Sequence, residues 1–273
     1  MTEMKIGNKD FQTKGKTYIM GILNVTPDSF SDGGKWNQMD AALRHVEDML
    51  AEGMDILDIG GESTRPGYTL IPDQQEIERV VPVIEAVKAR FDVPISLDTY
   101  KSAVAKAGLS AGADLINDIW GLKYDPQMAG VIAAAGAPCC LMHNRKAADY
   151  QSFFPEMLED LRGTLELADD AGIDRKTIIL DPGVGFAKSY ENNLECVKRL
   201  PELISAFDLP VLLGTSRKSM IGLALNLPSN QRVEGTIATS VMAVMAGCMF
   251  VRVHDVQANA RAVRMTEAVC YGV

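Results

Sequence analysis

Side chains that can bind ligands or transfer protons follow each of eight short apolar segments of the sequence. In chain order these groups are Asn24, Glu62 to Arg65, Asp98, Asn117 with Asp118, His143 with Asn144, Asp181, Ser216 to Ser219, and Arg252 with His254. A single aspartate after a strand is more often a helix N-cap than a catalytic group. Caps alone do not explain a set that also contains lysine, arginine and histidine. The set as a whole therefore predicts a functional site.

The cationic members of the set predict an anion-binding region. The segment GTSRKS (214–219) contains Arg217, Lys218 and Ser219, and Arg252 and His254 follow at the next apolar segment. Phosphate groups commonly bind where strands end and helices begin. The sequence contains no G-x-x-x-x-G-K-[ST] motif, so a nucleoside triphosphate is not indicated.

Asp98, Asn117 and Asp181 indicate a different kind of ligand. A carboxylate accepts two parallel hydrogen bonds from a ring N–H and an adjacent amino group, which suits a planar heterocycle. A pair of buried carboxylates that share a proton is the alternative. Met142 and Phe186 are apolar neighbours that can pack on a ring face, although packing in the core is the default for both.

Two further segments are rich in glycine, proline, serine and threonine: ILNVTPDSFSDGG (22–34) and GGESTRPG (60–67). Beyond their first residues they have little apolar surface to bury, which is typical of loops that carry function on a rigid scaffold. We expect both to close over a substrate.

The elements that must position these groups alternate between β-branched segments and helical patterns, which predicts an α/β fold with a parallel sheet. Strands are expected over 18–25, 56–61, 94–99, 115–119, 138–143, 177–181, 211–215 and 249–254. Helices are expected over 39–51, 73–89, 101–111, 126–135, 153–171, 189–200, 232–246 and 257–269. Eight such repeats favour a single (β/α)8 TIM barrel over residues 1–273, with residues 4–17 forming a short N-terminal β-hairpin. An open doubly wound sheet is the alternative, but the first βα turn lacks G-x-G-x-x-G.

Composition limits the partners. The net charge is −9 and the pI is about 4.9, so we expect neither nucleic acid nor a membrane as partner. Five cysteines do not predict a disulfide framework. The N-terminus is polar and no apolar run is long enough to span a membrane, so a cytoplasmic location is expected. The metal considered is Mg²⁺ between Asn24 and a ligand phosphate, because Mg²⁺ takes few protein ligands.

Seven segments together resemble the motifs of the bacterial dihydropteroate synthase family over residues 18–255. They are ILNVTPDSFSDGG, DIGGESTRPG, SLDT, LINDI, LDPGVGF, TSRKS and VRVHD. The resemblance implies a (β/α)8 barrel that usually forms a homodimer. It also implies that the small-molecule substrates are 6-hydroxymethyl-7,8-dihydropterin pyrophosphate and p-aminobenzoate, which condense to 7,8-dihydropteroate and pyrophosphate in folate synthesis.

The resemblance also implies individual roles. The residues implied at the pterin are Asp98, Asn117, Asp181 and Lys218, with Met142 and Phe186 lining the pocket. Those implied at the pyrophosphate are Asn24, Arg252 and His254, with Mg²⁺ at Asn24 and with Arg252 also stacked on the ring. Those implied at p-aminobenzoate are Phe30, Thr64, Arg65, Pro66 and Ser219, while Asp32 organises the closed state.

The chemistry expected from these roles is a dissociative substitution, in which pyrophosphate leaves before the aniline nitrogen attacks. Ionised Asp98 and Asp181 stabilise the cation that forms, and Lys218, Arg252 and His254 complete the catalytic set. The segment STRPG (63–67) has no insertion after it, so the resemblance also implies sensitivity to sulfonamides, which mimic p-aminobenzoate.

Two other functions remain open at this point. A methyltetrahydrofolate-dependent methyltransferase binds a pterin with similar groups but has no use for a site for pyrophosphate and p-aminobenzoate. A non-catalytic pterin-binding paralogue is expected to lose anion-binding and loop residues that are retained here, such as Asn24, Arg65 and Lys218.

Overall fold

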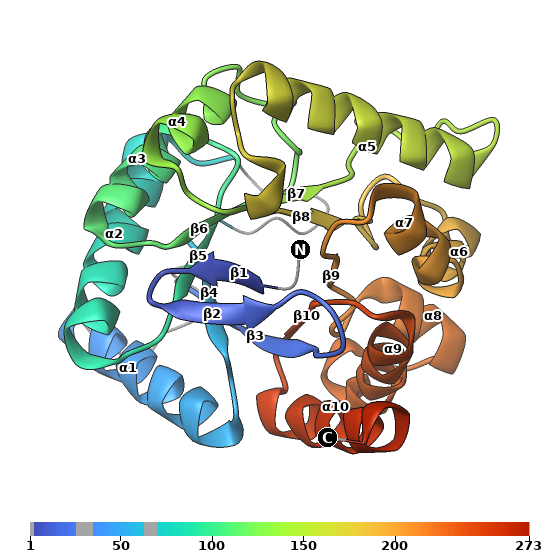
Figure 1. Cartoon of the computed structure of the whole chain (residues 1–273). Coiled ribbons are helices and arrows are strands. Elements are labelled where there is room, and N and C mark those ends of the chain that lie inside the picture. Colours follow the sequence, from blue (N-terminus) through green and yellow to red (C-terminus); the bar gives the residue numbers. More distant parts are fainter. Residues whose placement is uncertain (1–2, 26–34, 63–69, 273) are drawn as a thin grey trace.

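Eight parallel strands form the centre of the computed structural model, which describes residues 3–25, 35–62 and 70–272. They are hydrogen-bonded in the order β8-β7-β6-β5-β4-β3-β10-β9, and a bridge between Leu180 and Val211 joins β8 to the chain just before β9. The sheet therefore closes into a barrel (Figure 1). The strands are β3 (Tyr18–Asn24), β4 (Ile56–Gly60), β5 (Ile95–Asp98), β6 (Leu115–Asp118), β7 (Cys139–Met142), β8 (Ile178–Asp181), β9 (Leu212–Leu213) and β10 (Phe250–Val253). The (β/α)8 prediction is confirmed.

Helices surround the barrel on its outer face (Figure 1). They are α1 (Lys35–Glu52), α2 (Asp73–Arg90), α3 (Ser102–Ala111), α4 (Met128–Ala135), α5 (Phe153–Asp170), α6 (Tyr190–Lys198), α7 (Leu200–Phe207), α8 (Ser219–Leu225), α9 (Val233–Ala246) and α10 (Val256–Tyr271), with 3₁₀ turns at Arg175–Thr177 and Ser229–Gln231. Three differ from the sequence prediction, and the first is α1, which begins at Lys35, four residues before its expected start at 39. The helix expected over 189–200 ends at Lys198, and α7 begins with Pro201 in its first turn, where proline is favoured. The short helix α8 was not predicted.

The N-terminal hairpin is confirmed, because β1 (Glu3–Ile6) pairs antiparallel with β2 (Lys9–Gln12). It crosses one end of the barrel, the end nearer the viewer in Figure 1. Phe11 packs edge-on against Tyr18 with ring centroids 4.8 Å apart, and Met4 and Ile6 join the same buried cluster. The hairpin therefore seals the end of the barrel at which the strands begin.

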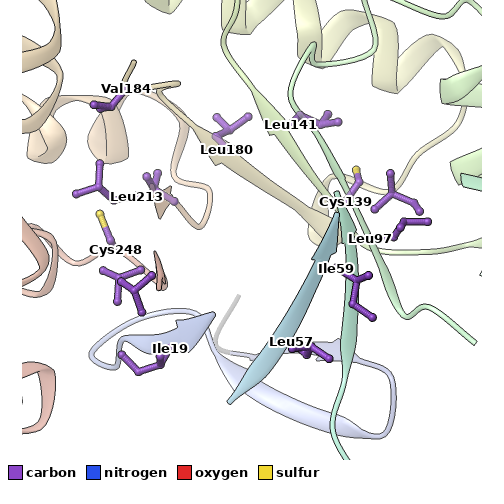
Figure 2. Close-up of a cluster of buried hydrophobic side chains, with 14 of the residues drawn as sticks. Ile19, Leu57, Ile59, Leu97, Cys139, Leu141, Leu180, Val184, Leu213 and Cys248 are labelled. Carbon is purple, nitrogen blue, oxygen red and sulfur yellow. The ribbon is translucent and has the colours of Figure 1, made fainter. Parts of the chain in front are cut away.

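Two apolar layers hold the strands in place. The outer layer joins alternate strand residues to helix residues such as Val80 and Leu161. Figure 2 shows three of its strand residues, Leu57, Ile59 and Leu97. The inner layer fills the barrel near the hairpin, and its strand residues are Tyr18, Met20, Ile56, Leu115, Cys140, Ile179, Leu212 and Phe250. Successive side chains of a strand point to opposite faces, so the residues two positions beyond several of these also face inward.

No helix in the described ranges is long and apolar enough to cross a membrane.

Candidate active site

The interior of the barrel changes from apolar to polar along each strand, and the polar part lies at the carboxyl ends. The strand register aligns Asn24 with Gly60, Gly60 with Asp98, and Asp98 with Asn117. These four positions therefore form one row across four neighbouring strands. At Gly60, a Cβ atom would stand 3.7 Å from the Asn24 Oδ1 atom and 3.7 Å from the Asp98 Cβ atom. The glycine thus leaves space between two polar side chains.

Arg252 is the central cation of this region. Its Nε donates to Asp58 Oδ2 at 2.6 Å, and its Nη2 donates to Asp98 Oδ2 at 2.7 Å. Burial alone would lower the pKa of Arg252, but the charges of Asp58 and Asp98 outweigh burial and raise it. The guanidinium is therefore a permanent charge that links β10 to β4 and β5. The ring-stacking role implied for Arg252 remains a prediction, because the structure holds no ring.

Asp58 is a site residue that the sequence analysis missed. It is completely buried, and its Oδ1 accepts hydrogen bonds from Ser96 Oγ at 2.5 Å and from Asn117 Nδ2 at 3.3 Å. It lies in the middle of the apolar segment ILDIG rather than after it, so a search of strand ends passes over it. Strand alternation was the available signal, because Asp58 is two residues before Gly60 and shares its inward face.

The two carboxylate oxygens of Asp98 differ in their hydrogen bonds. Oδ2 receives Arg252, whereas Oδ1 is buried without a hydrogen-bond partner among the described residues. Buried polar atoms are nearly always paired, so an unpaired carboxylate oxygen indicates a ligand donor. Burial raises the pKa of Asp98 to about 7, against the lowering effect of Arg252.

Asp181 and Lys218 form the opposite side of the interior. Burial raises the pKa of Asp181, and the positive charge of Lys218 partly offsets this rise. Burial lowers the pKa of Lys218 to about 8, and the negative charge of Asp181 partly offsets this fall. The Lys218 ammonium donates to the Val184 carbonyl and lies 4.8 Å from the centre of the Phe186 ring. At Gly214, a Cβ atom would stand 3.7 Å from Asp181 Oδ2 and 3.8 Å from Lys218 Nζ. Space is again left between two charged groups.

An apolar wall completes this part of the site. Met142, which is level with Asp181 in the strand register, is buried with Tyr100 and Ile119, and Trp120 and Phe186 pack against them. The structure thus brings Met142 and Phe186 together, as the sequence analysis expected of residues that line one pocket. Tyr100 and Trp120 were missed, because each lies one or two residues past a strand.

Of the residues predicted to bind the anion, His254 lies beside Ser216, whereas Arg217 is paired elsewhere. The His254 backbone N–H donates to Ser216 Oγ at 3.1 Å, and the His254 ring Nδ1 lies 3.0 Å from the same oxygen. Arg217, which the sequence analysis placed on this side, is bound to Asp255 through Nε and Nη2 at 3.0 and 2.5 Å. Its charge is therefore already paired. Ser219 begins α8 and is exposed.

Five predicted residues, Phe30, Asp32, Thr64, Arg65 and Pro66, lie outside the described residues. The described ranges contain no group of three His, Cys, Asp or Glu side chains that could hold a metal ion. Asn24 is half-buried beside Asp98. A single amide oxygen at an open site fits Mg²⁺ only where substrate oxygens complete the coordination.

A turn after β8 sets the position of Asp181, and it supplies a stability prediction. Gly183 has φ +70°, and its N–H donates to Asp181 Oδ1 at 2.7 Å. A Cβ atom there would stand 2.0 Å from the His143 carbonyl oxygen, whereas Gly172, with φ +80°, has nothing within 4 Å. Gly172→Ala should cost about 1–2 kcal/mol from the left-handed backbone alone. We expect Gly183→Ala to cost clearly more, measured by urea unfolding, and equal losses would contradict this.

The fold and the site together define a class of protein. A (β/α)8 barrel whose open end carries buried carboxylates, an amide and cations beside an apolar wall suits an enzyme that binds a planar, hydrogen-bonding ring next to an anion. The chain belongs to the family of pterin-binding enzymes, because the family described as pterin binding enzyme matches residues 20–254.

Within the family, the relatives are dihydropteroate synthases, which are transferases. The dihydropteroate synthase of Clostridium beijerinckii is 56% identical over 267 residues, covering 97% of this chain and 99% of that protein. A crystal structure of dihydropteroate synthase from Clostridium difficile in the presence of pteroic acid is 46% identical, with a TM-score of 0.91 over 98% of this chain and 99% of that one. A Yersinia pestis dihydropteroate synthase in complex with a sulfonamide drug is 41% identical, with a TM-score of 0.91 over 99% of this chain and 100% of that one.

Proposed function

We propose that the barrel mouth condenses 6-hydroxymethyl-7,8-dihydropterin pyrophosphate with p-aminobenzoate to give 7,8-dihydropteroate and pyrophosphate. The observation that carries this proposal is the unpaired Oδ1 of Asp98, which lies in one row with Asn24 and Asn117. It is a buried acceptor that a ring N–H of a ligand satisfies. The dihydropteroate synthases to which the chain is similar support the choice of ligand.

The pterin is placed with its amino edge on Asp181 and its other ring nitrogens on Asp98 and Asn117. Both carboxylates are acceptors when ionised. Lys218 interacts with the charge of Asp181 and lies over the Phe186 ring, and in this placement its ammonium donates to the ring carbonyl. Met142 and Phe186 pack on the ring faces, where burial of apolar surface adds affinity.

The reaction is a dissociative substitution at the methylene carbon. The C–O bond breaks first, and pyrophosphate leaves with the electron pair. The positive charge spreads into the ring, where Asp98 and Asp181 stabilise it from fixed positions. The aniline nitrogen then forms the new C–N bond and releases its proton to solvent.

The leaving group is held by Arg252 and His254, whose positive charge and ring N–H match phosphate oxygens. Asn24, together with phosphate oxygens of the substrate, would hold Mg²⁺, which would supply positive charge to the leaving group. Ser219 and the residues assigned to p-aminobenzoate at 64–66 complete the second substrate site in this proposal.

We also propose a homodimer formed through α8, α9 and α10, which lie together on one side of the barrel (Figure 1). Exposed apolar side chains gather on these three helices: Leu223, Leu225, Met242, Met245, Met265, Val269 and Tyr271. Large exposed apolar patches mark interaction surfaces.

A cytoplasmic location is proposed as well, because buried free cysteines suit a reducing compartment.

The proposed function has a direct test. Mixing the chain with both substrates and Mg²⁺ should release one pyrophosphate for each dihydropteroate formed. A sulfonamide should raise the apparent KM for p-aminobenzoate and leave kcat unchanged, because both compounds occupy one site. Failure to release pyrophosphate would favour the non-catalytic paralogue, and methyl transfer from methyltetrahydrofolate would favour the methyltransferase.

A further inference from the structure

The turn that follows β8, residues 182–188, is linked to three groups of the proposed pterin site. They are Asp181 through the Gly183 N–H, Lys218 through the Val184 carbonyl, and the ring of the turn's own Phe186. We call this segment the β8 turn. The side chains that hold its backbone in place have no role in the proposed reaction.

The β8 turn has a backbone that needs support from its surroundings. Gly183, Gly185 and Ala187 have φ values of +70°, +88° and +42°. The left-handed region is unfavourable for a residue with a Cβ atom, such as Ala187. Conformations of this kind persist only where surrounding contacts hold them. The shape of the β8 turn therefore depends on the side chains that bond to it.

Two neutral side chains bond backbone groups of the β8 turn. Asn193, a buried residue of α6, accepts the Gly185 N–H at its Oδ1 atom over 2.6 Å. The Tyr150 hydroxyl donates to the Ala187 carbonyl at 3.0 Å. Backbone groups on both sides of Phe186 are thus fixed by other parts of the chain.

Lys188 makes the central contacts. Its ammonium donates at 3.0 Å to the Phe186 carbonyl and at 2.9 Å to His143 Nδ1. A Cβ atom at Gly183 would stand 3.2 Å from the Lys188 Nζ atom. The ammonium therefore lies beside the residue whose N–H holds Asp181, and it also holds the backbone of Phe186.

His143 fixes the position of the Lys188 ammonium. It is completely buried, and burial together with the charge of Lys188 lowers the pKa of His143 to about 3. The ring is therefore neutral at pH 7. Because lysine only donates, Nδ1 is the acceptor and Nε2 carries the proton, which faces Asp160 Oδ2 at 2.9 Å. Arg145 Nε donates to the same oxygen at 2.6 Å. Hydrogen bonds thus run from the β8 turn to Asp160 on α5.

We infer that Lys188 is a positioning residue for the pterin substrate. The inference rests on the proposed function, in which Asp181 and Phe186 contact the pterin ring. A site whose groups are already fixed loses less conformational freedom when the ligand binds, so it binds more tightly. The residues assigned to p-aminobenzoate belong to other segments of the chain. Loss of Lys188 therefore weakens binding of the pterin and not of the amine.

The test compares Lys188→Met with Lys123→Met. Lys123 also donates to a backbone carbonyl, that of Asp160, at 2.9 Å, but it is exposed. For Lys188→Met we expect the dissociation constant of 6-hydroxymethylpterin, measured by calorimetry at pH 7, to rise about tenfold or more. Lys123→Met should leave this constant within about twofold of the unmodified chain.

A second variant, Tyr150→Phe, separates position from charge. Burial raises the pKa of Asp181, and the charge of Lys188 offsets part of this rise, so Lys188→Met changes a charge as well as hydrogen bonds. Tyr150→Phe removes only the hydrogen bond to Ala187 and keeps the ring that packs against Phe153. It should raise the same dissociation constant about two- to fivefold. It also decides the question if Lys188→Met does not fold.

A general loss of structure would affect both substrates, whereas the inference concerns one. The KM for p-aminobenzoate, measured at saturating pterin substrate, should change by less than about twofold in each variant. Equal rises in this KM and in the pterin dissociation constant overturn the inference. An unchanged pterin dissociation constant in Lys188→Met or Tyr150→Phe, or an equal rise in Lys123→Met, overturns it too. Failure of the unmodified chain to bind 6-hydroxymethylpterin or to form product would instead overturn the proposed function itself.

Discussion

Arg252→Met should lower kcat/KM for the pterin substrate by about two to three orders of magnitude. The change removes the cation that neutralises Asp58 and Asp98, and breaking a buried ion pair costs about 3–5 kcal/mol. That cost falls on the stability of the fold, whereas the loss of kcat/KM follows from the missing charge at the reacting group, and removal of one preorganised donor lowers kcat by about 10²–10³. It also removes a proposed ligand of the departing pyrophosphate, so kcat should fall as well as affinity. Steady-state kinetics with a pyrophosphate-release assay measures both effects.

Arg199→Met is the matched control for Arg252→Met. Arg199 also pairs with two carboxylates, Glu195 and Glu202, but on the outer surface at α6. Exposed pairs of this kind contribute about 0–1 kcal/mol. Activity should remain within about twofold of the unmodified chain. Retention of activity within tenfold by Arg252→Met would contradict the assignment of Arg252 to the reaction.

Asp98→Asn should reduce kcat/KM for the pterin substrate by at least about a hundredfold, and it should change the pH profile. In the unmodified chain Asp98 has a pKa of about 7 and Lys218 one of about 8. As the pH falls through 7, Asp98 gains a proton and loses the charge that stabilises the cation. As the pH rises through 8, Lys218 loses its proton. The profile of kcat/KM should therefore be bell-shaped between these two values.

The asparagine variant should lose the acid limb of this profile and keep the basic limb. Asp114→Asn is the control, because Asp114 is also a largely buried carboxylate that bonds the β5 backbone, at Ile95 N–H, near the opposite end of the barrel. It should lower the melting temperature and leave both limbs in place. An unchanged acid limb in Asp98→Asn would show that another group titrates there.

Much of the barrel could be predicted from the sequence, because buried parallel strands are continuous apolar runs and helices bury one face. Most strand ends were correct to one residue, but the strand expected over 211–215 is reduced to Leu212–Leu213. Gly214 follows directly, and a glycine in a strand weakens pairing. The break between α6 and α7 was signalled by Pro201, which begins a helix more readily than it continues one.

The site could be predicted only in part, for a physical reason. Asp98, Asn117, Asp181 and Lys218 were selected because polar residues after apolar runs are conspicuous, and their roles stay predictions. The pairing of Arg252 with Asp58 depends on β10 and β4 both pairing with β3, which brings residues 194 positions apart within 2.6 Å. Nothing local in the sequence encodes that contact. The same holds for the buried Lys101 ammonium, whose hydrogen-bond partners Glu62, Ile71 and Glu76 lie 25 to 39 positions away in the sequence.

The change from apolar to polar side chains along each strand has a consequence for which substitutions the barrel interior can accept. On β6, Leu115 packs in the sealed end and Asn117 faces the mouth, and on β10 Phe250 and Arg252 are divided in the same way. In the proposed function, two neighbouring inward positions of one strand therefore serve folding and reaction separately. Laboratory evolution can therefore change the residues at the sealed end to raise thermal stability and the residues at the mouth to alter substrate specificity, with little effect of one set on the other.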